Sequence, residues 1–250
     1  MKYLLTLVVV FATTTSNAQY AESDPTAIGI LDRMSEVIGD LYACSFTLTI
    51  IHDVVHRNGS ADDGHSLVTS HNTSRIFMSG FDKLLIDSNG DKGHRGIWYD
   101  GAQLAWYSYD ENNFVVVDAP DGTVETMYTL HEKYEIDFPA ADFFNPYLTD
   151  DLLETMNSIE YIGRSWIDDT KVYHIMAEND EMRVEFWITD DSILLPKKMR
   201  ISYLTKEGMP RYEAELSDWK VNPDLPNAMF KFSPPPGARQ IAIAVSTDEE

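Results

Sequence analysis

Four histidines in the first third of the chain are the side chains best suited to binding a transition metal. His52 and His56 lie four residues apart, a spacing that suits zinc on one face of a helix, and His65 and His71 follow them. The surrounding residues predict strand rather than helix, and they supply neither a glutamate beside the first histidine nor an obvious third ligand. We therefore interpret these histidines as solvent-facing residues and expect no metal and no other cofactor.

A calcium loop is the second possible site, because the segment Asp87–Gly93 carries side-chain oxygens at its first, third and fifth positions. Its sixth position is Lys92, where such loops need glycine, and its twelfth is Trp98, where they carry a bidentate glutamate. The pair Asn89 and Gly90 is typical of the turn in a β-hairpin. We predict a hairpin turn at these two residues.

Catalytic signatures are absent from the sequence: it has no Gly-x-Ser-x-Gly elbow, no glycine-rich phosphate loop and no dinucleotide fingerprint. The single cysteine, Cys44, lies between an expected helix and an apolar strand, where a buried, inert thiol is the common case. The 41 acidic residues contain close pairs by chance, so no catalytic pair can be singled out. We expect a protein that is not an enzyme, with a carboxylate-based hydrolase as one alternative.

The charge balance excludes two classes of partner. The chain has 250 residues, with 19 Lys and Arg against 41 Asp and Glu, which gives a formal net charge of −22. Such a chain has no positive field for a nucleic acid or for an anionic membrane surface. Its 44% hydrophobic content, with only 13 Gly and 11 Pro, predicts one folded domain with a sizeable core.

The first residues are typical of an export signal. Lys2 is followed by the apolar run Leu4–Phe11, which is too short to cross a bilayer, and by a small-residue site that ends at Ala18. We expect cleavage after Ala18 and a periplasmic protein of a Gram-negative-type envelope, without stable membrane insertion. Residues 1–18 are then the signal peptide, 19–238 a single domain, and 239–250 an extension that ends in a loose acidic tail.

The hydrophobic pattern places helices around two sets of strands. Asp24 and Pro25 precede apolar residues at three- and four-residue steps, which predicts a helix over about 24–42. A second helical region is expected between 121 and 157, with a short helix near 150–156. Apolar residues alternate from Phe46, and further strand-like runs, separated by turn formers, follow at about 66–78, 82–88, 94–99, 102–109 and 113–118. The alternation is strong again at 182–188, 198–203 and 211–216.

About ten strands in meander order, with helices before and between them, predict an α+β fold. We expect a strongly curved antiparallel sheet, an incomplete and half-open β-barrel, with helices covering its concave side. Three strands are apolar on both faces, at Ile97–Tyr99, Leu104–Tyr107 and Phe114–Val117. They need cover on both faces, so the concavity holds either an apolar ligand or a completely filled core.

Several short motifs, in this order and spacing, resemble a family of uncharacterised predicted periplasmic proteins in the LolA/LppX-like lipoprotein-carrier superfamily. The motifs are Tyr99-Asp100-Gly101, Tyr107 through Phe114, Ala119-Pro120, Phe138–Phe143, Leu195–Lys198 and Phe230–Ala238. The resemblance covers roughly 24–238. It implies an incomplete antiparallel barrel, LolA-like, lidded by helices, whose hydrophobic cavity holds acyl chains during transport across the periplasm.

The leading hypothesis is a non-enzymatic periplasmic carrier that binds a lipid or an acylated lipoprotein. We expect it to be a monomer that exchanges its cargo with a membrane-bound loading or receiving protein. An accessory protein with a filled barrel that docks a protein partner is the other alternative. The expected lid is the helix of 24–42 together with Met127, Tyr128, Tyr134, Phe138, Phe143 and Phe144. The expected cavity wall is Phe46, Leu48, Trp98, Trp106, Phe114, Phe186 and Ile188.

Overall fold

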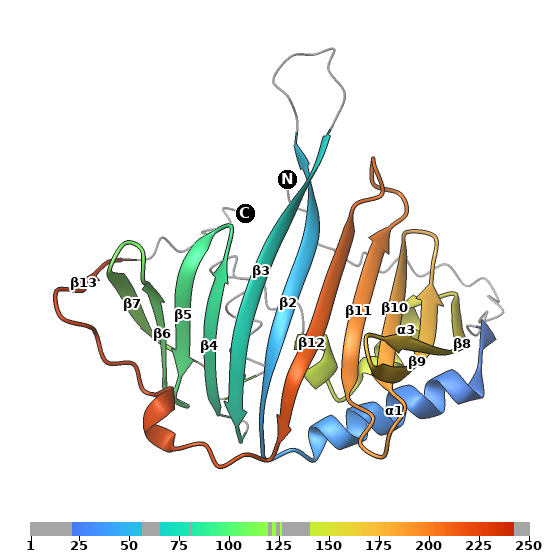
Figure 1. Ribbon diagram of the computed structural model, residues 1–250, viewed down its shortest axis with the longest axis horizontal. Helices are drawn as coiled ribbons and strands as arrows, with labels where there is room; N and C mark the ends of the chain where they lie inside the picture. Colours follow the sequence, from blue (N-terminus) through green and yellow to red (C-terminus); the bar gives the residue numbers. More distant parts are fainter. Residues whose placement is uncertain are drawn as a thin grey trace, which may run out of the picture.

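A computed structural model describes residues 22–56, 66–80, 82–119, 122–123, 126 and 141–242 (Figure 1). Most of these residues belong to one long sheet, and helices pack against one of its faces. The expected signal peptide and most of the expected acidic tail lie outside the described residues, as does most of the expected helical region between 121 and 140.

The described sheet has 13 strands in the order β1-β8-β9-β10-β11-β12-β2-β3-β4-β5-β6-β7-β13. The strands of the first half are β1 (Glu22–Ser23), β2 (Ala43–His56), β3 (Ser66–Ser79), β4 (Lys83–Gly90), β5 (Gly93–Tyr99), β6 (Gln103–Ser108) and β7 (Asn113–Asp118). Those of the second half are β8 (Ser158–Ile167), β9 (Thr170–Glu178), β10 (Met182–Thr189), β11 (Pro196–Tyr203), β12 (Arg211–Val221) and β13 (Arg239–Gln240).

The antiparallel meander expected from the alternating sequence is confirmed, with a larger number of strands than the ten expected. Neighbouring strands from β8 to β7 pair antiparallel, whereas the two-residue strands β1 and β13 pair parallel to β8 and β7 at the two ends of the sheet. Hydrogen bonding does not join these two ends, so the curved sheet is not closed. The turn of the β4–β5 hairpin lies at Asp91 and Lys92, two residues later than expected, because Gly90 pairs with Gly93.

Helix α1 (Pro25–Gly39) begins as its sequence predicts. The Asp24 carboxylate accepts a hydrogen bond of 2.7 Å from the Thr26 amide, and Pro25 occupies the first turn, where no amide proton is needed. Two further helical segments are described, the 3₁₀ helix η1 (Ala141–Phe144) and the helix α3 (Leu148–Thr155). The second of them confirms the short helix expected near 150–156.

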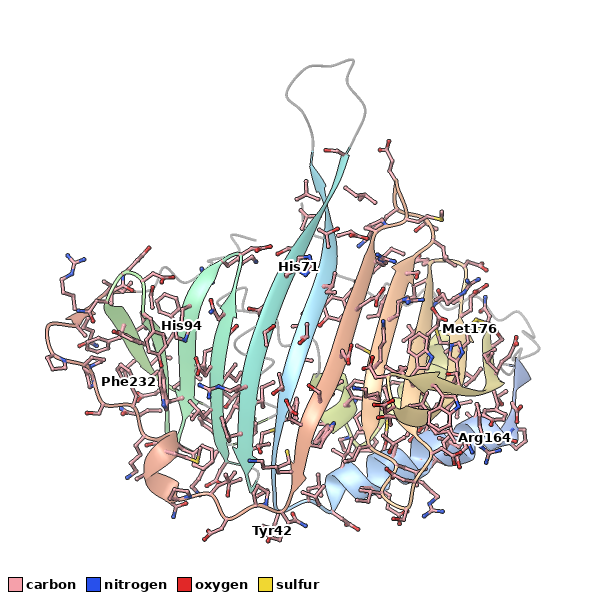
Figure 2. All side chains as sticks on the ribbon, viewed as in Figure 1. Tyr42, His71, His94, Arg164, Met176 and Phe232 are labelled. Atoms are coloured by element: carbon pink, nitrogen blue, oxygen red, sulfur yellow. The ribbon has the colours of Figure 1, made fainter. Side chains whose placement is uncertain are left out.

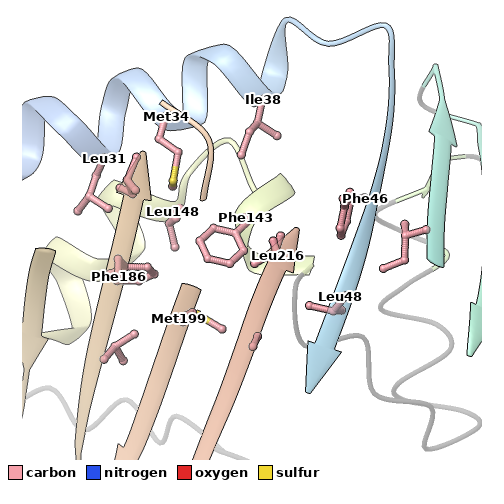
Figure 3. Packing of buried hydrophobic residues seen from close by; sticks show 14 of the residues in the cluster. Leu31, Met34, Ile38, Phe46, Leu48, Phe143, Leu148, Phe186, Met199 and Leu216 are labelled. Atoms are coloured by element: carbon pink, nitrogen blue, oxygen red, sulfur yellow. The ribbon is translucent and has the colours of Figure 1, made fainter. Parts of the chain in front are cut away.

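The core lies between these helices and the sheet, on the face that we call the inner face (Figure 3). Leu31, Met34 and Ile38 point from α1 toward the sheet, with Phe143 of η1 between helix and strands. The inner-face side chains opposite them include Phe186, Met199 and Leu216, from three adjacent strands. Apolar residues at alternate positions of the strands thus bury one face against the apolar stripe of α1.

Truncation of this core is expected to destabilise the protein strongly. Phe186 is 1% exposed and packs edge-to-face against Phe143, so Phe186→Ala should lower the free energy of unfolding by about 3–5 kcal/mol. Trp166→Ala removes a larger side chain that is 67% exposed and should change it by less than about 0.5 kcal/mol. Urea unfolding followed by circular dichroism measures both, and equal losses would contradict this account of the core.

Candidate ligand-binding face

The register of β2–β7 aligns the inner-face residues into rows that run across the strands. The first apolar row is Phe46, Ile76, Ile86, Ile97, Trp106 and Val115. The second apolar row is Cys44, Met78, Leu84, Tyr99, Leu104 and Val117. Most of these side chains are buried, and both rows are continuous over all six strands. The inner face of these six strands is therefore apolar across its width, and most of it is covered in this structure.

A third row, which we call the polar row, lies beside the first apolar row toward the β4–β5 turn. It consists of Ser74, Ser88, Arg95, Ser108 and Asn113. The hydroxyl of Ser74 donates to Ser88 (3.1 Å), Ser88 donates to the side-chain oxygen of Asn72 (2.9 Å), and the Asn72 amide donates back to Ser74 (3.1 Å). The inner face is thus amphiphilic, with hydrogen-bonding groups at one end and apolar groups at the other.

Five of the expected wall residues lie on this inner face. Phe46 and Leu48 come from β2, Trp106 from β6, and Phe186 and Ile188 from β10. Of the expected lid, Phe143 and Phe144 reach the same face from η1, and Phe144 stacks on Phe46 with ring centroids 5.9 Å apart. Met127, Tyr128, Tyr134 and Phe138 lie outside the described residues.

Trp98 and Phe114 lie on the opposite, outer face. Both rings contact Phe232 of the C-terminal segment, at centroid distances of 5.0 Å and 5.4 Å. The Trp98 ring covers Gly96, where a Cβ atom would come within 2.2 Å of the indole. These strands are apolar on both faces, so alternation alone does not tell which face is the inner one. The two residues therefore do not belong to the surface formed by the apolar rows.

Other inner-face residues were not singled out from the sequence. Ile76 and Ile86 alternate regularly in β3 and β4, so periodicity was a usable signal for them. Arg95 gave no such signal, because an arginine in a strand is ordinarily a solvent-facing residue. Cys44 is buried in the second apolar row, and this burial raises the pKa of its thiol to about 12, which agrees with an inert cysteine.

The outer face of β9–β12 carries charged side chains around a tryptophan. Trp187 is 8% exposed, stacks on His174 at 4.5 Å, and lies under the guanidinium of Arg200 at 5.3 Å. Glu213 bonds to Arg200 (3.2 Å) and to Lys198. Burial raises the pKa of Glu213, but the hydrogen bonds and charges of these two cations outweigh it, so its pKa lies below the ordinary value.

The structure does not bring the candidate metal ligands together. His52 is on the inner parity of β2 and His71 on the outer parity of β3, and the other two histidines have no described side chain. The Asp87 carboxylate bonds to Arg75 and to His94 (2.7 Å). No group of three or more His, Cys, Asp or Glu that could hold a metal occurs within the described ranges.

Where a described carboxyl group has a shifted pKa, the shift is downward. This holds for Asp24, Asp87, Asp91, Asp190 and Glu213, and the pKa of Asp190 falls to about 2 through hydrogen bonds from Tyr173 and Lys171. A general acid in glycoside or ester hydrolysis needs the opposite shift. These carboxylates therefore serve ion pairs and backbone hydrogen bonds.

The register and the helices define the class of protein: an open, curved antiparallel sheet with an apolar inner face that is partly covered by helices. The chain belongs to the DUF2092 family of predicted periplasmic proteins, whose profile matches residues 27–244. This match confirms the family resemblance of the sequence motifs. No helix within the described ranges is both long enough and apolar enough to cross a membrane.

Among curated proteins, the chain is 29% identical over 149 residues to the uncharacterized protein MJ0687 of Methanocaldococcus jannaschii, covering 56% of this chain and 41% of that one. It therefore spans about two fifths of the length of this relative. An uncharacterized conserved protein from Thermus thermophilus is similar in structure, at 11% identity and a TM-score of 0.48, with 86% of this chain and 98% of that one covered.

Two further solved structures are similar to this chain. The lipoprotein LppX of Mycobacterium tuberculosis has 9% identity and a TM-score of 0.40, with 81% of this chain and 98% of that chain covered. MucB of Pseudomonas aeruginosa, in its complex with MucA, has 12% identity and a TM-score of 0.43, with 83% and 61% covered. Membership of the family rests on the profile match and not on these distant likenesses.

The Glu213 ion pairs predict a specific loss of stability in acid. Because the pKa of this carboxyl is lowered in the folded state, its contribution is complete above its ordinary value of 4.5 and is lost as the pH falls through the lowered value. The melting temperature of Glu213→Gln should therefore fall less than that of the wild type between pH 6 and pH 3. Glu160→Gln, at an exposed position of β8, should follow the wild-type curve, and parallel curves for all three proteins would contradict the assignment.

Proposed function

We propose that this protein is a non-enzymatic periplasmic carrier that binds the acyl chain of a lipid against the inner face of its sheet. The observation that carries the proposal is the pair of continuous apolar rows across β2–β7. Small barrels are filled by their own side chains, whereas a wide, curved, open sheet can enclose an apolar ligand between its inner face and the segments that cover it.

The described helices account for part of that cover. Figure 1 shows α1 and α3 beside β8–β12, away from β4–β7. The backbone of α1 lies near β8, α3 and η1, and Phe144 of η1 stacks on Phe46 of β2. Among the described residues, the cover contributed by these helices lies over one half of the sheet. The two apolar rows continue across the other half, where most of their side chains are also buried, so an acyl chain would have to displace the cover there.

The energetics favour a ligand with a long hydrocarbon chain. Burial of a 16-carbon chain contributes about 0.8 kcal/mol per methylene, on the order of 10 kcal/mol before the chain and the lid are ordered. That amount is enough for a tight and reversible complex in the periplasm. Export through the signal peptide, cleaved after Ala18, would bring the protein between the two membranes. There it would act as a monomer, and a membrane-bound partner would load or receive the lipid or acylated lipoprotein.

Docking of a protein partner is a second candidate function, favoured by one observation. The β2–β3 hairpin extends beyond its neighbours at the top of Figure 1, and Val54, Leu67 and Val68 near its end are 42–49% exposed. Val54 and Val68 pair across the hairpin and share one face, whereas Leu67 lies on the other face. Exposed apolar side chains near the end of a hairpin are typical of interaction surfaces. This surface is separate from the apolar rows, so binding of an acyl chain and docking at the hairpin are compatible.

Quenching by a brominated fatty acid tests the carrier function. Bromine atoms on stearate quench nearby indoles, so we expect the acid to reduce the emission of the wild type and to do so less in Trp106→Phe, which removes an inner-face indole. Trp98→Phe, on the outer face of the adjacent strand, is the matched control and should keep the quenched fraction. Absence of quenching in the wild type, or equal loss in both variants, would refute binding at the apolar rows.

A further inference from the structure

Arg95 is a cation on the inner face. In β5 it lies two and four residues before Ile97 and Tyr99, which belong to the two apolar rows, so its side chain shares their face. Its neighbour His94 faces outward and stacks on Tyr109 at 3.9 Å (Figure 2). The guanidinium carbon of Arg95 lies 5.8 Å from the ring centroid of Trp106, an inner-face residue of the adjacent strand. Arg95 therefore lies at the boundary between the polar row and the first apolar row.

Apart from Arg95, the arginines on the inner strands of the sheet are paired with carboxylates, whereas for the exposed Arg239 of the two-residue edge strand β13 no pair is seen among the described residues. The pairs are Arg75 with Asp87, Arg164 with Asp190, Arg183 with Glu178, Arg200 with Glu213, and Arg211 with Asp53. Within the described part of the chain, Arg95 has no carboxylate at ion-pair distance, although the sequence holds 41 acidic residues against 19 basic ones. A half-buried guanidinium without a counter-ion is costly, because it loses water on one side and gains no opposite charge.

The groups next to Arg95 in the register are hydrogen-bonding and uncharged. Ser88 pairs with it on one side and Ser108 on the other. Ser108 accepts a bond of 3.2 Å from the Glu111 amide, and its hydroxyl proton remains available to donate. The Glu111 carboxylate is exposed and accepts a bond of 2.6 Å from Asn113, at the far end of the row from Ser74. Ser108 thus offers a hydroxyl proton beside Arg95, whereas the Ser88 proton is bonded to Asn72 and the Glu111 carboxylate is bonded to Asn113.

We infer that Arg95 binds the oxyanion of an acyl lipid with an acidic head, a carboxylate or a phosphate monoester, whose tail lies along the apolar rows. This inference rests on the proposed carrier function and specifies its ligand. The guanidinium supplies a fork of donors that matches either oxyanion, and the Trp106 ring lies beside it. Along the strands, the first and second apolar rows lie about 7 Å and about 14 Å from the row of Arg95. A lipid whose head binds Arg95 can therefore place its tail directly on these rows.

The inference separates two kinds of cargo. A fatty acid or a lysophosphatidic acid carries an oxyanion at the end of its chain, as Arg95 requires. The acyl chains of a lipoprotein are joined through neutral esters and amides, which give the guanidinium no opposite charge. An acidic single-headed lipid therefore fits the polar row better than a lipoprotein does.

The test compares chains of equal length that differ in the head. Displacement of the uncharged fluorescent probe N-phenyl-1-naphthylamine measures the affinity of the whole mature protein for palmitate, palmitoyl lysophosphatidic acid and hexadecanol. The wild type should bind one or both acids at least about tenfold tighter than the alcohol, since a charge-assisted hydrogen bond contributes that much. Which acid binds tighter distinguishes a carboxylate from a phosphate head, and inorganic phosphate without a tail should not displace the probe.

Variants of Arg95 test whether this residue causes the preference for acids over the alcohol. Arg95→Gln should weaken binding of the acids about tenfold and leave hexadecanol within about twofold, and Arg95→Lys should keep part of the preference. Arg33→Gln is the matched control, because it makes the same charge change at an exposed position of α1. If Arg95→Gln does not fold, the wild-type preference and Arg95→Lys decide the question.

Two results overturn the inference, and they are distinguishable. Equal affinity of the wild type for acids and alcohol, or equal effects of Arg95→Gln and Arg33→Gln, would refute the acidic head and leave the carrier function intact. Failure of every acyl compound to displace the probe, together with absence of quenching by brominated stearate, would refute the carrier function and this inference with it.

Discussion

The rest of the structure depends on the two-residue period of the strands, combined with a register that stays in phase from β2 to β7. Because each strand points alternate side chains to opposite faces, one unbroken register aligns Phe46 with Val115 across six strands. A slip of one residue in any strand would place ion-pairing residues such as Asp87 on the inner face. The two apolar rows and the polar row therefore all depend on this one register.

The outer face of the same sheet carries charged residues that make it compatible with exposure to water. Its charged residues form pairs between adjacent strands, as Arg75 does with Asp87, so their desolvation is offset by an opposite charge. Large rings there are covered locally, Trp187 by Arg200 and Trp98 by Phe232 of the C-terminal segment. A sheet this wide would otherwise expose apolar area on both faces, which promotes association.

The sequence predicted elements well where a single period dominates. Helix α1 was predictable from Asp24 and Pro25, and the strands from β3 to β7 from short apolar runs separated by turn formers. In contrast, neither β8 nor β9 is among the predicted runs, and in β8 a bulge between Tyr161 and Gly163 interrupts the period. The faces of Trp98 and Phe114 could not be assigned, because what decides them is Phe232, more than a hundred residues away in the chain. Long-range packing of this kind leaves no local signal.

An amphiphilic inner face also constrains the direction in which a ligand lies. The polar row is next to the turn of the β4–β5 hairpin, where Asp91 and Lys92 are exposed, whereas Tyr99 and Leu84 at the other end of the same strands are fully buried. A charged head is costly to bury and a hydrocarbon tail is costly to expose, so a bound amphiphile has its lowest free energy with the head toward the turn. For the proposed acyl ligand, the same gradient would make that end of the sheet the easier route for release, because the head would regain water before the tail leaves the apolar rows.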